Sequence, residues 1–167
     1  MKYYAILILT VICASVFVEP MIELLNLTQE KVVLGTAVTN ACRAAKDRSM
    51  IYEKHRDLDA HADEEKFKDY FSEAFEAAVK ADCTGRTGDV MTFAPRPGND
   101  RFGTFTVRLE FVNSVDVATE QEKTAVKVNA EAVYRFKTNY LRLAEDAGED
   151  VEYKLKSERM LLLTVKN

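Results

Sequence analysis

The run YYAILILTVICASVFV, residues 3–18, carries no charge and follows directly on Met1 and Lys2. As a helix it rises about 24 Å, somewhat less than the hydrocarbon core of a bilayer, which is about 30 Å thick. Continuation through Pro20 to Ile22 brings the helix close to that thickness. We therefore expect a membrane span, and this expectation constrains the rest of the chain more than any other feature.

The orientation and the end of the span follow from the charges around it. Lys2 favours a cytoplasmic N-terminus, with the bulk of the chain extracytoplasmic. Glu19 then lies near the outer interface, where a carboxylate costs much less than at the bilayer centre. We expect a single-pass cell-membrane protein in which residues 1–25 form the transmembrane helix and residues 26–167 an extracytoplasmic domain.

A cleaved secretory signal is the alternative interpretation of this run. Cys13, Ala14 and Ser15 offer a weak cleavage site, but the run is longer than most signal cores and its basic region is Lys2 alone. A lipoprotein site at Cys13 is disfavoured by the bulky Ile12 before it. A retained anchor is the interpretation that we favour.

The composition limits the classes of partner. With 167 residues, the chain is long enough for one ordinary domain besides the anchor. Its net charge is -4, and the basic residues are scattered among acids, so it lacks the electrostatic footprint of a nucleic-acid-binding protein. We expect no nucleic-acid partner.

Two helices are predicted from apolar residues at helical spacing. The membrane helix continues as one long helix to about Met50 or Tyr52, with Pro20 as a candidate kink site. A second, amphipathic helix ends near Cys83. The apolar or small positions that carry these predictions are Leu27, Leu34, Val38, Ala41 and Ala45, and then Phe67, Tyr70, Phe71, Ala74, Phe75, Ala78 and Val79.

Further along the chain the apolar period changes to two, which predicts strands. One strand alternates from Phe105 to Phe111, a second from Val126 to Phe136, and a third runs from Tyr153 to Lys166. Residues 84–101, rich in Gly and Pro, predict a long loop with a short strand at residues 90–93. The fold class is therefore α+β: a three-stranded, or with that short strand four-stranded, antiparallel meander packed on the helices.

The sequence offers little catalytic chemistry. His55 and His61 lie among acids such as Asp57 and Asp59, but their spacing matches no metal-ligand pattern, so we expect a solvated turn there. The stretch TGRTGD lacks the Lys-Ser/Thr of a phosphate-binding loop, and no nucleophile lies in a recognisable elbow. We expect no metal, no cofactor and no enzymatic activity.

Cys42 and Cys83 lie on the exported side of the predicted membrane, where oxidation is allowed. If the two helices form a hairpin that turns near Asp57, these cysteines are out of step by about eleven residues, or roughly 16 Å at helical rise. That separation exceeds the reach of a disulfide. A Cys42–Cys83 bridge therefore needs another arrangement or a bent helix, and it remains open.

Four stretches carry a resemblance to a known family: PMIELLNL, LGTAVTNACRAA, AVYRF and KLKSERMLLL. In this order, around an apolar helix and a small antiparallel sheet, they resemble the TadE-like pseudopilins of the tight-adherence (Tad/Flp) branch of the type IV pilus family. In this resemblance Glu23 takes the acid position after the apolar segment. The stretch 41–45 takes the helix end and 134–136 a strand, with Arg135 where proline is common.

The resemblance implies a structural, pilin-like subunit of a Tad-type pilus or of a related secretion or conjugation apparatus. Its partners would be other pilin-like subunits or apparatus membrane proteins, with a homo-oligomer as one form. Pilins are usually cut after a small residue before the apolar run and carry a Glu near its start, whereas here Met1-Lys2 precede a run that has no acid. We therefore expect an unprocessed, membrane-resident relative rather than a major filament subunit.

The candidate assembly residues are Glu19, Pro20 and Glu23, because a carboxylate inside a bundle of helices needs a cation as partner. The alternative is that both acids simply lie at the membrane interface. Gly35 and Ala41 are candidate contact positions, since small residues admit a neighbouring helix or sheet, although packing on the protein's own domain is the interpretation that we favour for them. The rival function is a secreted or anchored ligand-binding module that uses the 84–101 loop.

Overall fold

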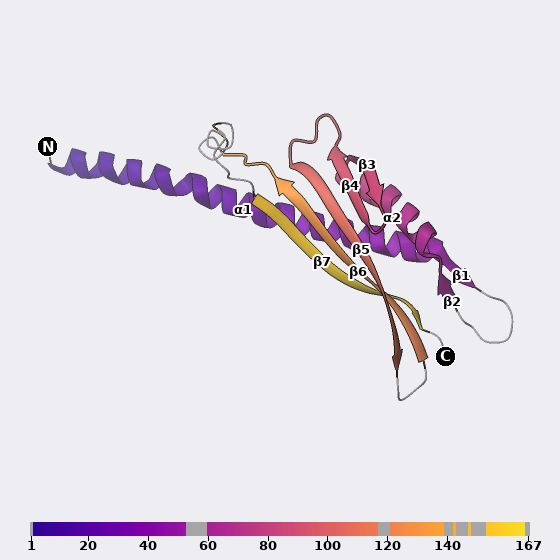
Figure 1. The fold of residues 1–167 in the computed structure, drawn as a ribbon. Helices are drawn as coiled ribbons and strands as arrows, with labels where there is room; N and C mark the ends of the chain where they lie inside the picture. The colour runs from indigo at the N-terminus through magenta and orange to yellow at the C-terminus, as the bar shows by residue number, and fades with distance from the viewer. Residues whose placement is uncertain are drawn as a thin grey trace.

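The structure is a computed structural model that describes residues 2–52, 60–116, 121–138, 142, 147 and 153–165. Within these residues it is an α+β fold, as predicted, with two helices and a five-stranded antiparallel sheet (Figure 1). Its elements are, in order, α1 (Lys2–Ser49), β1 (Met50–Tyr52), β2 (Ala60–Ala62), α2 (Glu64–Val79), β3 (Ala81–Thr87), β4 (Val90–Pro95), β5 (Phe102–Asp116), β6 (Gln121–Tyr134) and β7 (Tyr153–Val165).

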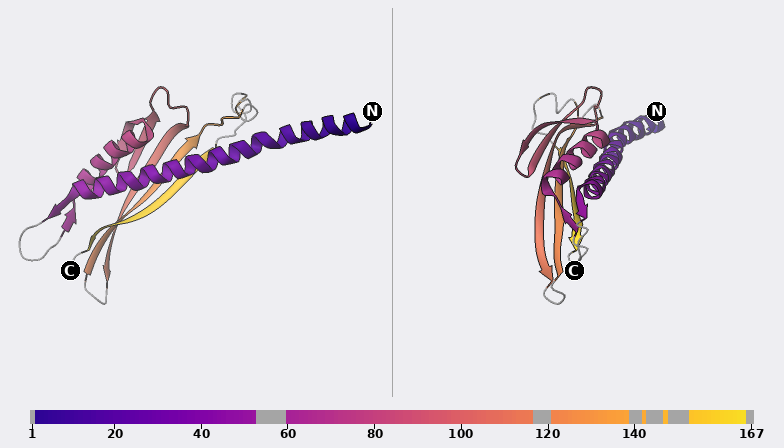
Figure 2. Two further views of the ribbon diagram at one scale, coloured as in Figure 1. Left: turned by 180° about the vertical axis from the view of Figure 1, so that it is seen from behind. Right: turned by 90° about the vertical axis from the view of Figure 1, so that its right-hand side faces the viewer.

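Helix α1 is a single helix of 48 residues, about 72 Å long at helical rise, with Pro20 inside it. Its N-terminal part projects away from the rest of the molecule, whereas its C-terminal part lies against the sheet (Figures 1 and 2). The predicted continuation of the apolar run into the domain is therefore confirmed, and the helix ends at Ser49, just before the expected boundary.

Helix α2 begins at an acidic cap and ends at a left-handed residue. The Asp63 carboxylate accepts hydrogen bonds from the amides of Glu65 and Lys66, which satisfies two free donors of the first turn. At the other end Lys80 adopts φ 52°, and its amide bonds to the carbonyl of Glu76. The predicted end near Cys83 was wrong, because the left-handed residue turns the chain into β3 at once.

The main sheet has the strand order β3-β4-β5-β6-β7, with antiparallel pairing throughout. The prediction of three or four strands was too low, and β1 and β2 form an additional two-stranded sheet. Most of the predicted 84–101 loop is a hairpin of β3 and β4, which turns at Gly88 with φ +59°. The sequence of β3 shows no alternation of apolar and polar residues, because β3 is an edge strand in which only Ala81 is buried.

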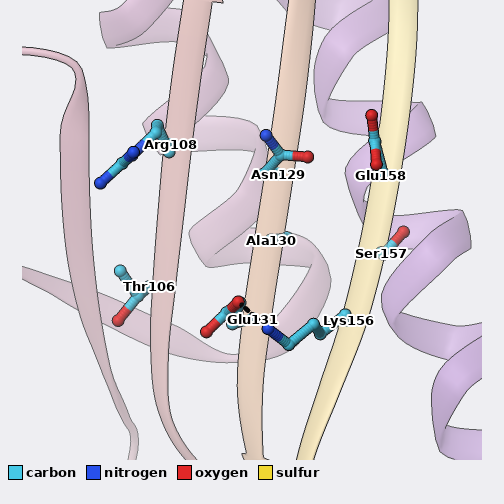
Figure 3. Close-up of a pocket in the computed structure, with 8 residues that line it drawn as sticks. All are labelled: Thr106, Arg108, Asn129, Ala130, Glu131, Lys156, Ser157 and Glu158. Atoms are coloured by element: carbon cyan, nitrogen blue, oxygen red, sulfur yellow. Dashed lines mark ion pairs between the residues drawn. The ribbon is translucent and has the colours of Figure 1, made fainter.

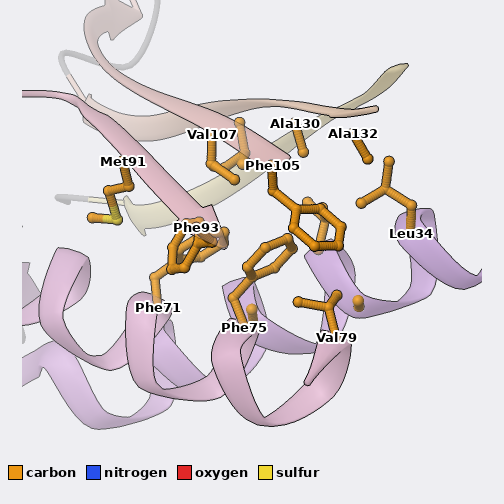
Figure 4. Packing of buried hydrophobic residues seen from close by; sticks show 14 of the residues in the cluster. Leu34, Phe71, Phe75, Val79, Met91, Phe93, Phe105, Val107, Ala130 and Ala132 are labelled. Atoms are coloured by element: carbon orange, nitrogen blue, oxygen red, sulfur yellow. The ribbon is translucent and has the colours of Figure 1, made fainter. Parts of the chain in front are cut away.

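The core lies between the two helices and one face of the sheet (Figure 4). The predicted inward residues of β5 and β6 are buried, apart from Phe111, which is partly buried, and the predicted stripe of α2 buries Phe67, Phe71, Phe75 and Val79. The Phe75 ring contacts Phe93 and Phe105 at centroid distances of 5.0 and 5.7 Å, which joins α2 to β4 and β5. Both helices lie on this face of the sheet, and no described element covers the other one (Figure 2).

Candidate functional site

The projecting part of α1 is an exposed apolar arm. Its most apolar window has a mean hydropathy of 2.4, and none of that window is buried. The large side chains of the arm are exposed on all sides of the helix, from Tyr3 at 87% to Val18 at 50%. By length and composition α1 is a helix that can cross a membrane.

Where the arm meets the domain, two acids of α1 turn toward the sheet and become buried. Glu23 is 3% exposed and Glu30 is 1% exposed. They lie on the same side of the helix as Leu27 and Leu34, at spacings of three and four residues. Buried carboxylates are costly unless they are paired and hydrogen-bonded, so their partners define this junction.

Glu23 accepts three hydrogen bonds from the end of β6 and the segment that follows it. The Tyr134 hydroxyl donates to Oε1 at 2.6 Å, the Lys137 amide to the same oxygen at 3.3 Å, and the Thr138 amide to Oε2 at 2.9 Å. Burial, followed by the bond to the Glu23 carboxylate, raises the pKa of Tyr134 well above its ordinary value. The hydroxyl therefore remains a donor through the physiological pH range.

The Glu30 carboxylate is held by two basic side chains. Its Oε1 lies 2.6 Å from Nζ of Lys137 and 3.5 Å from Nε of Arg101, whereas its Oε2 is buried without a hydrogen-bond partner. Lys137 thus contacts both acids, Glu23 through its amide and Glu30 through its ammonium group. We call Glu23, Glu30, Tyr134, Lys137 and Thr138 the junction cluster.

The junction cluster fixes the helix to the sheet at the point where the helix leaves the domain. Its bonds join residues that are more than 100 positions apart in the chain. Because Glu23 uses both oxygens and Glu30 one, the arm has a defined direction relative to the sheet. The bonds of the cluster position the helix, and its polar groups, apart from Oε2 of Glu30, are paired with one another.

The predicted assembly residues fall into two groups. Glu19, half-buried, has an Oε2 that is shielded from solvent and has no hydrogen-bond partner, and Pro20 is exposed. Gly35 and Ala41 are buried against the protein's own domain, as Glu23 is. Their role in assembly remains a prediction, but for Glu23, Gly35 and Ala41 the structure provides intramolecular contacts.

Gly35 lies where α1 packs closely on side chains of β7. A Cβ added there would lie 3.0 Å from Nη2 of Arg159 and 3.6 Å from Oγ of Ser157. Close to this point, Nε of the same arginine donates a hydrogen bond to the hydroxyl of Thr39 at 3.3 Å. The glycine therefore admits the polar side chains of β7 against the helix.

The three cysteines are free thiols in the structure, with Cys42 buried and Cys13 and Cys83 exposed. Burial raises the pKa of Cys42 to about 12, so its reactive thiolate is suppressed. The sequence also raised the question of a metal site. Within the described ranges, no group of three or more His, Cys, Asp or Glu residues is placed to hold a metal ion. His55, Asp57 and Asp59 lie outside those ranges.

A shallow pocket lies on the sheet face opposite the helices (Figure 3). Its lining combines ion-paired and polar side chains, with Glu131 and Lys156 2.7 Å apart. It holds no buried acid or base that would suggest catalysis. The lining residues are Thr106, Arg108, Asn129, Ala130, Glu131, Lys156, Ser157 and Glu158.

Three parts of the junction cluster were not predicted from the sequence. They are the burial of Glu30, the hydrogen bond from Tyr134 to Glu23, and the contacts of Lys137. The signal for Glu30 was present, because it occupies a position between Leu27 and Leu34 on the apolar stripe of the helix. Tyr134 was predicted to face inward, and a buried tyrosine hydroxyl needs a partner. Nothing local indicated Lys137, whose contacts depend on the path of the chain after β6.

Comparison with known proteins adds no family assignment. The chain matches no protein-family model, no curated protein and no solved structure.

Proposed function

We propose that this protein is a single-pass, membrane-anchored structural subunit of pilin-like design. The observation that carries the proposal is that one helix serves both as the exposed apolar arm and as a core element of the domain. From Lys2 to Ile22 the helix measures about 30 Å, which equals the hydrocarbon thickness of a bilayer. An arm continuous with the core transmits the position of the anchor rigidly to the sheet, as a structural subunit requires.

The finer assignment, to a TadE-like pseudopilin of a Tad-type pilus or a related secretion or conjugation apparatus, rests on the four resembling stretches. Their contacts support it, because the stretches meet in pairs. Glu23 of PMIELLNL bonds to Tyr134 of AVYRF, and Gly35 of LGTAVTNACRAA faces Arg159 of KLKSERMLLL. The resembling residues therefore form one structural unit, the contact of the long helix with β6 and β7.

In this proposal the N-terminus is cytoplasmic and the sheet lies outside the membrane, where it contacts other subunits. Glu19 is the sharpest assembly candidate, since it is an acid at the membrane exit with one oxygen that lacks a hydrogen-bond partner. A cation on a neighbouring subunit would satisfy it. Glu23 is less suited to that role because its acceptors are occupied within the chain.

A ligand-binding module that uses residues 84–101 is the second candidate. Most of residues 84–101 belongs to the β3–β4 hairpin, and only the stretch after Pro95 is a loop. A binding screen on the ectodomain distinguishes this function from the structural one. Within the described part of the chain, no observation favours an enzyme.

Two experiments test the proposal. The intact mass of the native protein reports the anchor: an unmodified chain means a retained span, loss of about two residues means pilin-type processing, and loss of about fifteen means a cleaved signal. Co-purification of apparatus proteins with Glu19→Ala, compared with Thr28→Ala on the exposed side of the same helix, reports assembly. We expect Glu19→Ala to reduce recovery; unchanged recovery would remove the assembly role of Glu19.

A further inference from the structure

The end of β6 and the start of β7 lie beside α1 where this helix leaves the domain (Figures 1 and 2). Tyr134 and Tyr153 are directly paired across the two strands, and the Tyr134 hydroxyl donates to Glu23 at 2.6 Å. The Thr138 amide donates to the same carboxylate at 2.9 Å, and the Arg142 amide donates to the Thr138 carbonyl at 3.0 Å. One end of the sheet is thus tied to a single level of the long helix.

The level of this end relative to a bilayer follows from the length of the anchor, and it rests on the proposed membrane insertion. With Lys2 to Ile22 in the hydrocarbon core, Glu23 lies about 1.5 Å beyond that core at helical rise. The headgroup layer on each side of the core is about 5–8 Å thick. The groups that bond to Glu23 therefore lie at the level of the lipid headgroups.

The other contacts between α1 and the sheet lie farther out. Glu30 is about 12 Å beyond Ile22 at helical rise, which exceeds the thickness of the headgroup layer. Arg101 and the ammonium group of Lys137 contact Glu30, so they lie at that outer level. The end of β5 and the start of β6 are farther still from the N-terminal part of α1 (Figures 1 and 2).

The exposed side chains at the inner level are of the kind that bilayer interfaces favour. Tyr153 is 47% exposed, and Leu24, one residue beyond Glu23 on the helix, is 66% exposed. Arg135 and Arg142 are also exposed. Tyrosine is enriched at the boundary between lipid and water, and the guanidinium group of arginine pairs with phosphate oxygens in bidentate geometry. We call Arg135, Arg142 and Tyr153 the proximal group.

We propose that the proximal group contacts the surface of the bilayer that holds the anchor. The Tyr153 ring lies among the lipid headgroups, and the guanidinium groups of Arg135 and Arg142 bind phosphate groups of phospholipids. The domain then has two attachments to the membrane, the helix and this end of the sheet. Together they hold the sheet at a fixed tilt to the bilayer, with the end of β5 pointing outward.

The charge of the surrounding segment indicates which feature of the lipid is bound. Residues 135–154 contain four basic and five acidic residues, so this segment is not the polybasic kind that anionic lipids attract. The ligand is therefore the phosphate group that all phospholipids share, and the anchor supplies its proximity. The acidic residues are Glu145, Asp146, Glu149, Asp150 and Glu152.

Quenching of a fluorescent label by a lipid with a headgroup nitroxide tests the contact. In a Cys13→Ser, Cys83→Ser background, the full chain with Tyr153→Cys is labelled and reconstituted in phosphatidylcholine vesicles that contain this lipid. Met160→Cys, on the same strand and 68% exposed, is the matched control. We expect quenching at position 153 to be about twofold stronger or more, because position 160 lies beyond the headgroup layer. Equal quenching at the two positions overturns the proposal.

Two further measurements keep the result interpretable. Arg135→Cys provides a second labelled position at the same end, and circular dichroism establishes which variants fold; strong quenching is expected there too, and a folded Arg135→Cys quenched no more than Met160→Cys also overturns the proposal. Replacing part of the phosphatidylcholine by phosphatidylglycerol should leave the quenching unchanged, and quenching that appears only with this anionic lipid contradicts a shared phosphate ligand.

A label on the natural Cys13, in a Cys83→Ser chain, reports the anchor separately. Cys13 is exposed near the middle of the apolar helix, so a nitroxide on the lipid acyl chain should quench it. A chain that is quenched at position 13 but not at position 153 refutes the contact of the proximal group alone. A chain that is not quenched at position 13 refutes the proposed anchor.

Discussion

The hydroxyl of Tyr134 donates a 2.6 Å hydrogen bond to the carboxylate of Glu23, which lies 111 positions earlier in the chain. Tyr134 is the last inward-facing residue of β6, and Glu23 lies on α1 where this helix leaves the domain. Together with the other bonds of the junction cluster, this contact holds the long helix against the sheet where it leaves the domain.

Tyr134→Phe removes that donor and retains the ring. The buried Glu23 carboxylate then loses one of its three hydrogen bonds, so the free energy of unfolding should fall by about 1–3 kcal/mol. Thermal unfolding of the full chain in micelles, followed by circular dichroism, measures the change. Tyr153→Phe, at a half-exposed tyrosine, should have no effect; equal effects of the two variants would show that the hydroxyl contributes nothing.

The same hydroxyl predicts an alkaline loss of stability. Its pKa in the folded protein is raised, first by burial and then by the bond to Glu23, so the stability that it contributes is present below the ordinary value of 10.0. That contribution is lost as the pH rises from about 10 toward the raised pKa. The difference in unfolding temperature between wild type and Tyr134→Phe should therefore shrink above pH 10, and a difference that grows there would contradict the assignment.

Lys137 should matter chiefly because of Glu30. Lys137→Met leaves the buried carboxylate with Arg101 as its remaining cation, at 3.5 Å, and should cost about 2 kcal/mol. The cost is below that of a fully buried pair because the Lys137 side chain is 35% exposed. In a Glu30→Gln background the same substitution should cost much less, and a double-mutant cycle that shows full additivity would exclude the pair.

Gly35 should tolerate no large side chain. Gly35→Leu drives the side chain into Arg159 and Ser157 and separates the helix from β7, so the unfolding temperature should fall. Thr36→Leu is the matched control, because Thr36 is exposed on the same turn of the helix. A Gly35→Leu variant as stable as this control would mean that the close approach is not required.

The helices, the extent of β7 and the inward-facing rows of β5 and β6 were predictable because their signal is periodic and local. Strand β3 was missed, since Gly85 interrupts it and it turns only Ala81 into the core, whereas most of β4 was predicted as the short strand at residues 90–93. The junction cluster needed more than periodicity. Its acids were visible on the apolar stripe of the long helix, but their partners come from the far end of β6, and such pairing depends on the complete sheet.

The central claim, an anchor in the membrane with the sheet outside, is tested most directly by labelling Cys83 with a membrane-impermeant maleimide on spheroplasts. Cys83 is exposed on the domain, whereas Cys42 is buried, with its pKa raised to about 12, and serves as the internal control. Peptide mass spectrometry reports which thiol has reacted. The account predicts membrane-associated protein labelled at Cys83 and not at Cys42 before lysis; labelling of Cys83 only after lysis, or recovery of the protein outside the membrane fraction, would contradict it.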